Sequence, residues 1–396
     1  MLRRTMCNLD SMNQSALLSA RDAAARLGVK LDTLYAYVSR GLLRSVAVPG
    51  SRERHYRRED IDAFRAARAL GKAAAQPGPE TAMTAIDSAI SLIEGGRLYY
   101  RGRDAVRLSD GATLEEIAAL LWGTEIGAAP GSIAATQADF GAMGWPRLDL
   151  IGRCQIRLAT IAADSPPIGD LDRLALADAG RSILLEMVGC LIEGQPASTP
   201  VHRQLAAHWR LDETGADLLR RCLVLIADHE LNTSTLAARC VASTGAPLAA
   251  VVSAALGALS GPRHGGATSR AEAVFHAEKD AFDMMMAVAS RLARGEKLPG
   301  IGQPLYPDGD PRAVAILYAL SLIFPQARRL VGYRPNVDFA LAAVSSSLNL
   351  PPGAALGLFV IGRTVGWIAH AIEQHESNVQ IRPRARYTGP RPQEQR

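Results

Sequence analysis

Two histidines lie in short stretches that also carry charged or conformationally free residues. Residues 227–232 (ADHELN) hold Asp228, His229, Glu230 and Asn232 at the edge of an apolar helix. Residues 261–267 (GPRHGGA) set His264 beside a glycine pair, and glycine lets a backbone or a ligand approach closely. Histidine is the side chain most often used in general acid–base catalysis, so both stretches are catalytic candidates. The plain alternatives are a surface helix start for the first stretch and an ordinary turn histidine for the second.

Two further stretches supply an amide, a guanidinium and a carboxylate. Residues 298–313 (LPGIGQPLYPDGDPRA) contain three glycines and four prolines, which exclude a regular helix or a central strand. This rigid loop presents Gln303 on one side and Arg312 on the other. Residues 333–348 (YRPNVDFALAAVSSSL) place Asp338 at the start of a long helix. This aspartate is a further candidate site residue, and the alternative is a plain N-cap aspartate.

Length and composition set the broad class of the protein. At 396 residues the chain is too long for one ordinary core, so we expect two or more domains. Its 48% hydrophobic and 21% charged residues are typical of a globular protein. The five cysteines are scattered without a CxxC pair, which favours a reducing compartment and argues against a disulfide framework or a structural zinc. The N-terminal residues lack the apolar run of a secretory signal.

Two long uncharged runs, residues 241–259 and 339–362, could be membrane spans or core helices. The first contains Ser, Thr, Gly and Pro, and the second is split by Pro351-Pro352. Both features favour buried core helices. The sequence therefore predicts a soluble, cytoplasmic protein that does not associate with a membrane.

The net charge of +5 is unevenly distributed along the chain. Residues 15–75 carry twelve Lys or Arg against six Asp or Glu, and residues 1–14 add one further positive charge. Residues 76–396 are left with a net charge of −2. A local basic excess is the electrostatic pattern expected of a nucleic-acid-binding module.

The N-terminal segment has the pattern of a winged helix-turn-helix. Residues 19–28 (SARDAAARLG) begin with a capping serine and end at a glycine, and a second short helix follows over residues 31–41. Residues 42–57 (LLRSVAVPGSRERHYR) predict a β-hairpin around Pro49-Gly50, the wing. A third helix follows, with Ile61 and Phe64 facing inward. We assign residues 1–75 to this domain and residues 76–84 to a linker rich in Ala, Pro and Gly.

This segment resembles the MerR and excisionase type of winged helix-turn-helix module, through AAARLGV, TLYAYVSRGLL and RHYRREDI. In such modules the second helix enters the major groove and the wing touches the DNA backbone. The resemblance implies DNA binding within residues 15–70, and the alternative is a helical adaptor or dimerisation module. The exposed candidates for DNA contact are Thr33, Tyr35, Arg40, Arg52 and Arg54.

After the linker the chain changes character. Residues 93–105 (IEGGRLYYRGRDA) predict a small β-hairpin, and ATLEEIAALLWG begins a helical body in which Thr113 caps a helix and Ile117, Leu120 and Leu121 form its apolar face. Most of the remaining sequence predicts helices joined by short loops. It has no G-x-G-x-x-G after a strand, no phosphate-binding loop and no G-x-S-x-G motif.

The ordered motifs of this body resemble the citrate synthase family over about 300 residues. They are the hairpin, LEEIAALLW, ADHELN, GPRHGGA, the 298–313 loop, NVDF, GRTVGWIAHAIEQ and RPRARYTG. The resemblance implies a mainly α fold with a large helical domain (85–264 and 356–396) and a small one (265–355). It also implies an active site in the cleft between them, and a homodimer or a higher dimer-based oligomer.

The resemblance implies a role for each matching residue. Asp338 corresponds to the base that removes a proton from the acetyl methyl group of acetyl-CoA. His264 corresponds to the donor that hydrogen-bonds the thioester oxygen. A methyl group beside a thioester is a very weak acid, so a carboxylate can deprotonate it only where the developing oxyanion is stabilised. The enol then attacks the ketone of oxaloacetate, and hydrolysis gives citrate and CoA.

The remaining matches concern substrate binding. His229, Arg312, Arg363 and Arg382 correspond to the family's oxaloacetate ligands, and guanidinium groups suit its two carboxylates. Arg382 is expected to reach the site of the other subunit. Leu298, Gly300, Ile301 and Gly302 lie where the family's loop contacts the CoA adenine. No metal is implied, and no cofactor other than the CoA thioester substrate.

The chain departs from the family at Gln303. The family loop usually reads G-[FY]-G-H-P, and its histidine polarises the ketone of oxaloacetate. Glutamine keeps a neutral N–H donor but cannot lend a proton as an imidazole does. Three outcomes are open: a slower citrate synthase, an enzyme with a shifted acceptor or acyl-CoA such as a 2-methylcitrate synthase using propionyl-CoA, or a DNA-binding regulator that senses these metabolites.

Overall fold

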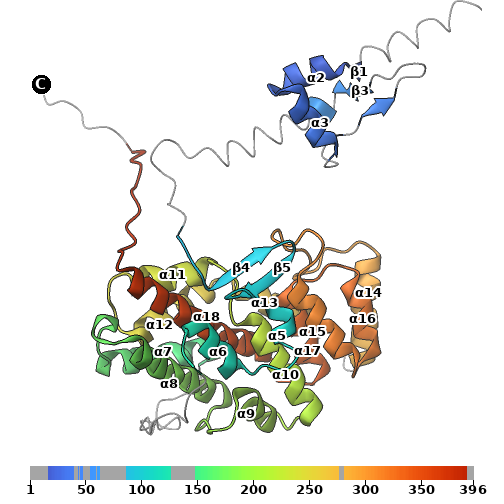
Figure 1. The fold of residues 1–396 in the computed structure, drawn as a ribbon. Coiled ribbons are helices and arrows are strands. Elements are labelled where there is room, and N and C mark those ends of the chain that lie inside the picture. The colour runs from blue at the N-terminus through green and yellow to red at the C-terminus, as the bar shows by residue number, and fades with distance from the viewer. Residues whose placement is uncertain are drawn as a thin grey trace, which may run out of the picture. The chain divides into compact units, whose positions relative to one another are not determined.

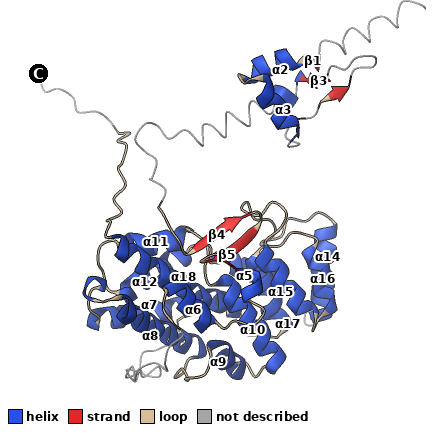
Figure 2. Ribbon diagram, in the orientation of Figure 1, coloured by secondary structure: helices blue, strands red, loops and turns tan. Residues whose placement is uncertain are grey.

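The computed structural model describes residues 17–39, 43, 45–47, 54–58, 60–62, 86–125, 148–275 and 281–389. The chain divides into two compact units, residues 1–86 with 383–396, and residues 87–382. Helices make up most of the described chain (Figure 1), and its strands form two small sheets (Figure 2), which confirms the predicted fold class. The predicted linker at 76–84 lies outside the described residues. The split of the second unit into large and small domains stays a prediction.

The first unit is a helix-turn-helix with a small antiparallel sheet of strand order β1-β3-β2. Its elements are β1 (Leu17–Leu18), α2 (Ala20–Leu27), α3 (Leu31–Ser39), β2 (Val46–Ala47) and β3 (Arg54–Arg57). The pairing of β2 with β3 agrees with the predicted wing, whose tip at Pro49-Gly50 lies outside the described residues.

Local signals explain where helix α2 begins and ends. The hydroxyl of Ser19 accepts from the N–H of Asp22 at 3.2 Å and donates to its carboxylate at 2.7 Å. Gly28 ends the helix with φ of 65°, a left-handed conformation that glycine adopts without strain. The helices and the sheet share one small core, whose buried members are Leu18, Ala23, Ala24, Leu27, Leu34, Leu43, Tyr56 and Ile61. Of the two residues expected to face inward from the third helix, Ile61 is buried and Phe64 lies outside the described residues.

The second unit opens with the predicted hairpin. Strands β4 (Ser91–Glu94) and β5 (Arg97–Tyr100) are joined by Gly95-Gly96, with φ of 57° and 74°, and β6 (Arg103–Asp104) adds a third antiparallel strand. Helix α5 (Ala105–Leu108) follows, and then α6 (Leu114–Trp122), where Thr113 and Glu116 form a full capping box. Ile117 and Leu121 are buried as expected, and Leu120 is half-buried.

A layered bundle of helices forms the rest of this unit. The bundle consists of α7 (Leu150–Asp164), α8 (Arg173–Ile192), α9 (Val201–His208), α10 (Glu213–Ile226), α11 (Thr233–Ala242), α12 (Leu248–Leu259), α13 (Gly266–Phe275), α14 (Ala281–Ala293), α15 (Pro311–Ser321), α16 (Arg328–Val331), α17 (Val337–Ser347) and α18 (Ala354–Ser377), with short 3-10 turns at Ile168–Asp170 and Pro325–Ala327. Most of their buried apolar residues join one continuous core.

Helix α18 lies at the centre of the bundle and contacts α6, α8, α10, α11, α12 and α17. Among the described helices it is the one that is long and apolar enough to cross a membrane, but 94% of its most apolar stretch is buried inside the protein. That burial is typical of a core helix. Each of the two uncharged runs is interrupted near its Gly and Pro residues. In the first run α11 ends at Ala242 and α12 begins at Leu248. In the second run α17 ends at Ser347, before Pro351-Pro352, and α18 begins at Ala354.

Candidate active site

The glycine-rich loop packs against the residues that lead into helix α17. The N–H of Gly302 donates to the carbonyl of Arg334 at 2.9 Å, and the N–H of Asn336 donates to the carbonyl of Gly300 at 2.8 Å. Gly300 has φ of 82°, and a Cβ there would lie 2.7 Å from Cβ of Phe339. A side chain at this position would therefore separate the loop from α17. Three of the predicted CoA-contacting residues, Gly300 to Gly302, are thus paired with residues 334–336, which lie two to four positions before Asp338.

Arg312 is held by a buried carboxylate at the end of the same loop. Asp310 caps helix α15, and its two oxygens accept from Nε and Nη2 of Arg312 at 3.0 and 2.7 Å. The same carboxylate accepts from the N–H of Val337 at 3.1 Å. Burial opposes the charge of Arg312, but Asp310 outweighs it and raises the pKa, so the guanidinium stays cationic. Asp310 therefore joins the loop, Arg312 and the start of α17.

Arg363 is buried on α18 with part of its guanidinium unused. Its Nε donates to the carbonyl of Ile226 at 2.9 Å, while Nη1 is buried and has no partner among the described residues. Gly362 and Gly366 let α18 pack closely against the end of α10. A Cβ on Gly362 would lie 2.4 Å from Cγ1 of Ile226, and a Cβ on Gly366 would lie 2.3 Å from the carbonyl oxygen of Ala227. A buried unpaired N–H of a cation is costly alone and is suited to an anionic ligand.

His229 faces a tyrosine that also belongs to the loop. Its Nε2 lies 2.9 Å from the hydroxyl of Tyr306, and both side chains are buried. Burial, and then the charges of Arg312 and Arg363, lower the pKa of His229 well below its usual value. Burial raises the pKa of Tyr306. At neutral pH the site therefore contains a neutral imidazole beside a protonated phenol.

Asp338 is not the N-cap of α17. Asn336 fills that role, since its side chain accepts from the N–H of Phe339 at 3.2 Å. The carboxylate of Asp338 instead accepts from the hydroxyl of Thr268 on α13 at 2.5 Å. Burial raises the pKa of Asp338, and the bond from Thr268 opposes that rise. The plain N-cap alternative for Asp338 is thereby excluded.

His264 lies just before α13 and is hydrogen-bonded to Ser234 on α11, the helix that follows the ADHELN segment. Its Nε2 lies 2.9 Å from the hydroxyl of Ser234, which also contacts Oδ1 of Asn232 at 2.8 Å and accepts from the indole N–H of Trp367 at 3.2 Å. Burial, followed by the charge of Arg363, lowers the pKa of His264 to about 4. The imidazole is therefore neutral above that pH and can donate from one nitrogen only.

Five of the predicted residues act on one another electrostatically. The charge of Arg363 lowers the pKa of His229 and of His264, and the charges of Arg312 and Arg363 also lower that of Asp338 against the effect of burial. Direct contacts link them as well, since Tyr306 lies against both His229 and Arg312, and Phe359 lies against both His264 and Arg363. The Asp310 carboxylate joins Arg312 to the residue before Asp338. These contacts gather the five predicted residues in one candidate site.

Two predicted residues are connected to this site less directly. Gln303 is half-buried in the loop, and its carbonyl accepts from the N–H of Tyr306 at 2.9 Å, while its amide has no partner in the described part of the chain. Arg382 is exposed beyond the end of α18, where the N–H of Ile381 donates to the hydroxyl of Ser243. The role of Arg382 in a partner's site stays a prediction.

Several residues of the site were not among the candidates from the sequence. Asp310 and Tyr306 belong to the loop that drew attention, and the Asp-Pro-Arg order of 310–312 is itself a capping signal. Thr268 and Ser234 carry no such local signal, because each hydroxyl acts on a residue 30 or more positions away.

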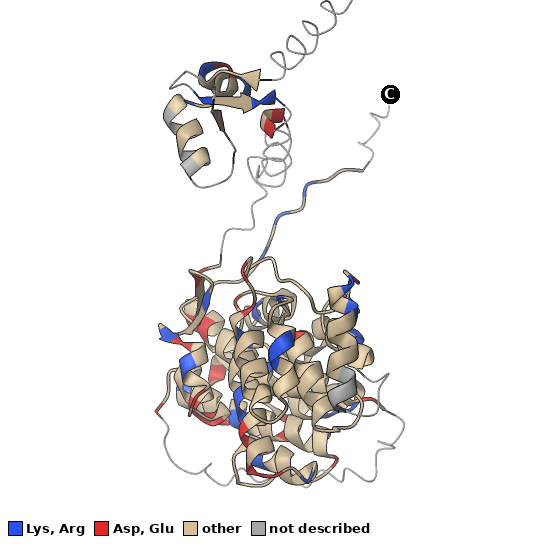
Figure 3. Ribbon diagram, turned by 90° about the vertical axis from the view of Figure 1, so that its right-hand side faces the viewer, with Lys and Arg blue, Asp and Glu red and all other residues tan. Residues whose placement is uncertain are grey.

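The predicted DNA-contacting residues differ in exposure. Tyr35 is 51% exposed, Thr33 is half-buried, and Arg54 is exposed with a bond to the hydroxyl of Ser45 at 3.0 Å. Arg40 and Arg52 lie outside the described residues. Helix α3 (Leu31–Ser39) has no Lys or Arg. The described basic residues between 17 and 62, whose positions are coloured blue in Figure 3, are Arg21 and Arg26 on α2, Lys30 before α3, Arg54 and Arg57 on β3, and Arg58 directly after it.

Comparison with family models matches two segments of the chain. Residues 184–384 match the model of "Citrate synthase, C-terminal domain", and residues 17–69 match a helix-turn-helix domain. These two matches agree with both of the resemblances found in the sequence.

Individual relatives extend the similarity beyond these models. A putative citrate synthase 2 of Mycobacterium tuberculosis is 38% identical over 187 residues, which span 43% of this chain and 50% of that protein. The chain thus covers about half the length of this curated relative. A citrate synthase of Haloferax volcanii is 31% identical over 76% of this chain and 93% of that protein. A 2-methylcitrate synthase of Shewanella oneidensis is 29% identical over 80% of this chain and 94% of that protein.

Two solved structures share the fold. Citrate synthase of Thermotoga maritima has a TM-score of 0.62 at 26% identity, covering 80% of this chain and 96% of that one. Citrate synthase of Thermoplasma acidophilum, solved as a ternary complex with carboxymethyl coenzyme A and oxaloacetate, has a TM-score of 0.60 at 25% identity and the same coverage.

Proposed function

The chain belongs to the citrate synthase family, and from this premise we propose that it condenses acetyl-CoA with oxaloacetate to give citrate and CoA. The observation that carries the proposal is the segment 264–268. Its histidine can hydrogen-bond a thioester oxygen, and its threonine, four residues later, holds the carboxylate that would act as the base. Proton removal beside a thioester needs both groups at once.

The first step is removal of a proton from the acetyl methyl group by Asp338. The carboxylate is a stronger base when its pKa is raised, and burial supplies that rise. The negative charge that develops on the thioester oxygen would be met by a hydrogen bond from His264, so that an enol forms.

The tautomer of His264 depends on Ser234. The hydroxyl has one proton and two acceptors within reach, Oδ1 of Asn232 and Nε2 of His264. Oδ1 of Asn232 already accepts from the N–H of Thr235 at 3.0 Å. When Ser234 donates to Nε2, the imidazole carries its proton on Nδ1 and can donate it toward the substrate.

Oxaloacetate would bind through Arg312, Arg363 and His229. The unpaired Nη1 of Arg363 supports this role, because a substrate carboxylate would satisfy it. The neutral imidazole of His229 can donate to oxaloacetate without adding a third positive charge. The enol carbon then attacks the ketone, whose oxygen would be hydrogen-bonded by the amide of Gln303. Water cleaves the resulting citryl thioester, which gives citrate and free CoA.

Propionyl-CoA is the alternative donor, and 2-methylcitrate the corresponding product. A relative of that activity aligns over most of this chain. One extra methylene in an acyl pocket discriminates by only about 1–3 kcal/mol, so both donors are tested together. The CoA thioester would be a substrate and not a resident cofactor.

The experiment measures free thiol released by the purified full-length chain with oxaloacetate and either acyl-CoA. We expect release with at least one donor, and a loss of roughly 100- to 10,000-fold in Asp338→Asn, which keeps the shape of the side chain but removes the base. The proposal would be contradicted if thiol release stayed at the background rate with both donors while circular dichroism showed that the protein was folded.

A second function is proposed for the helix-turn-helix unit, namely DNA binding coupled to ligand binding in the enzyme body. Its support is the basic excess of residues 1–75 and the exposed Tyr35 and Arg54. We expect the full chain to shift duplex DNA at low salt, with affinity that falls steeply as salt rises. Addition of oxaloacetate and CoA should change that affinity. If neither the full chain nor residues 1–76 bind any DNA at low salt, the unit is an adaptor.

We further propose that the protein is cytoplasmic and works as a homodimer or a higher dimer-based oligomer.

A further inference from the structure

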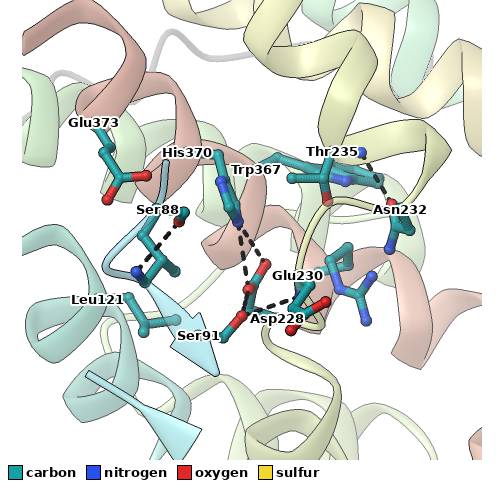
Figure 4. A network of polar contacts seen from close by, with 12 residues as sticks. Ser88, Ser91, Leu121, Asp228, Glu230, Asn232, Thr235, Trp367, His370 and Glu373 are labelled. Atoms are coloured by element: carbon teal, nitrogen blue, oxygen red, sulfur yellow. Dashed lines mark hydrogen bonds and ion pairs between the residues drawn. The ribbon is translucent and has the colours of Figure 1, made fainter. Parts of the chain in front are cut away.

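One hydroxyl contacts both neighbours of His229. Ser91, the first residue of β4, donates to Oδ2 of Asp228 at 2.5 Å and accepts from the N–H of Glu230 at 3.0 Å (Figure 4). Glu230 has φ of 52°, a left-handed conformation that non-glycine residues adopt rarely and at some cost. The hairpin therefore holds the turn that carries the substrate histidine from both sides.

Other atoms of the hairpin reinforce this contact. Oε1 of Glu230 accepts from the N–H of Ile93 at 3.3 Å. Tyr100, which pairs with Ser91 across the two strands, places its hydroxyl 3.3 Å from the carbonyl of Asp228. The side chain and the backbone of Asp228 are thus fixed by one cross-strand pair.

The other side of Asp228 is occupied by His370 of α18. Nη1 of Arg239 lies 3.0 Å from Nδ1 of His370, and a guanidinium can only donate, so Nδ1 is the acceptor and the ring proton lies on Nε2. That Nε2 lies 3.3 and 3.4 Å from the two oxygens of Asp228 (Figure 4). His370 therefore donates from Nε2 to a carboxylate that is completely buried.

Asp228 also lies beside the substrate arginine. Arg363, Gly366 and His370 share one face of α18, at positions i, i+3 and i+7. A Cβ on Gly366 would lie 2.6 Å from Oδ1 of Asp228, so this carboxylate packs into the space that the glycine leaves. Burial would raise the pKa of Asp228, but the contact with His370 and the charge of Arg363 lower it overall. The carboxylate is therefore ionised and offsets the charge of Arg363.

We propose that Ser91 and Asp228 are positioning residues for oxaloacetate, fixing the backbone of His229 and placing a buried negative charge beside Arg363. This inference rests on the proposed function, because His229 and Arg363 are its oxaloacetate ligands. Neither Ser91 nor Asp228 needs to touch the substrate. The backbone of the predicted CoA-contacting glycines is held by other contacts, the pairing of Gly300 and Gly302 with the residues before α17. Loss of Ser91 should therefore weaken oxaloacetate binding and leave acyl-CoA binding unchanged.

The first measurement is calorimetric titration of the full-length chain with oxaloacetate alone, which needs no turnover. We expect Ser91→Ala to weaken binding by roughly 10- to 100-fold, since it removes a hydrogen bond to a buried carboxylate. Ser91→Thr keeps the hydroxyl and should bind within about 3-fold of the parent chain. The matched control is Ser88→Ala, which removes a hydroxyl from the same segment. The Ser88 hydroxyl accepts from the N–H of Ile90 and bonds to the carboxylate of Glu373, so this variant should bind oxaloacetate like the parent.

The second measurement compares the two Michaelis constants. In Ser91→Ala we expect the KM for oxaloacetate to rise by a similar factor while the KM for acyl-CoA stays within about 2-fold. Asp228→Asn, which keeps the size of the side chain, should show the same split and serves where Ser91→Ala does not fold. Equal oxaloacetate affinity in Ser91→Ala and the parent, or a parallel rise of both constants, would overturn the positioning role alone. A parent chain that binds no oxaloacetate would overturn the proposed function and this inference with it.

Discussion

The hydroxyl of Thr268 donates to Oδ1 of Asp338 at 2.5 Å and so joins the first turn of α13 to the first turn of α17. His264 lies at the beginning of the same α13 segment, bonded to Ser234 on its other side. One short piece of chain, residues 264–268, therefore connects the proposed general base Asp338 to the proposed oxygen donor His264. Burial raises the pKa of Asp338, and the Thr268 bond opposes that rise.

Replacement of Thr268 by valine should move the acidic limb of the pH–rate profile. Asp338 acts only when ionised, and loss of a bond to its charged form raises its pKa further. The limb of kcat/KM should therefore shift to higher pH in Thr268→Val, and Thr268→Ser should restore it. Burial and the charge of Arg363 lower the pKa of His264 to about 4, and Thr268 does not contact this histidine, so we attribute the shift of the limb to Asp338.

The control for this prediction is Thr244→Val. The Thr244 hydroxyl donates to the carbonyl of Val241 at the end of α11, and Thr244 is outside the site. We expect an unchanged pH profile in this variant. An acidic limb that keeps its position in Thr268→Val would show that the 2.5 Å bond does not tune the base.

Local signals in the sequence were sufficient for many elements of the fold. The capping serine and terminal glycine of α2, the Gly95-Gly96 hairpin and the Thr113 capping box depend on residues within a few positions of each other. Their dihedral preferences and hydrogen bonds are decided before any tertiary contact forms. The same holds for the loop at 298–313, whose prolines and glycines exclude regular structure wherever the loop lies.

The support of the site could not be predicted in this way. Ser91 and Asp228 are 137 positions apart, and Thr268 and Asp338 are 70 apart. Nothing in the residue types of a strand serine or a helix threonine indicates which distant carboxylate it will meet. Motif resemblance supplied the groups proposed to touch substrate, while the residues that orient them became visible only after the hairpin and helices were assembled in space.

Substitution of Gln303 by histidine should raise the condensation rate with acetyl-CoA. An imidazole N–H is a stronger donor to the ketone oxygen than an amide N–H, and loss of a whole oxyanion donor costs about 100- to 1,000-fold. Because glutamine keeps a donor, we expect a smaller gain, roughly 10-fold in kcat. The measurement is thiol release at saturating oxaloacetate, with both acyl-CoA donors in parallel.

The opposite result would be equally informative about Gln303. A fall in rate with both donors would contradict an attenuated site and would indicate that the amide recognises a different acceptor. The control is Gln195→His, because Gln195 lies in the turn after α8, outside the loop. It should leave both rates unchanged.

Gly366→Ala should destabilise the protein because the added methyl group meets backbone that cannot move away. A Cβ at Gly366 would lie 2.3 Å from the carbonyl of Ala227 and 2.6 Å from Oδ1 of Asp228. Overpacking of this kind typically costs about 1–3 kcal/mol of the free energy of unfolding. Urea denaturation followed by tryptophan fluorescence measures it, since Trp367 is the next residue and is completely buried.

The matched variant is Gly257→Ala in α12. A Cβ there would meet Nε2 of Gln155 at 3.6 Å, an ordinary contact. Replacement of this helical glycine in the last turn of α12 by alanine should then stabilise the protein by about 0.5–1 kcal/mol. Equal free energies of unfolding in the two variants would mean that α18 can shift away from Ala227, and that its approach to the site is looser than the distances imply.

Mixed dimers should reveal whether Arg382 acts in the site of a partner. Within one chain this residue is exposed beyond α18, whereas Arg312 and Arg363 are buried. If Arg382 completes the other subunit's site, Arg382→Ala and Asp338→Asn should each be inactive alone and recover activity when their subunits exchange. Half of the dimers would then be mixed, and each would contain one intact site, which gives roughly one quarter of the parent activity. The control pairs His264→Ala with Asp338→Asn, which both act within their own chain and should give no recovery. Thiol release measured after subunit exchange distinguishes these results, and no recovery with Arg382→Ala would place that residue outside the partner's site.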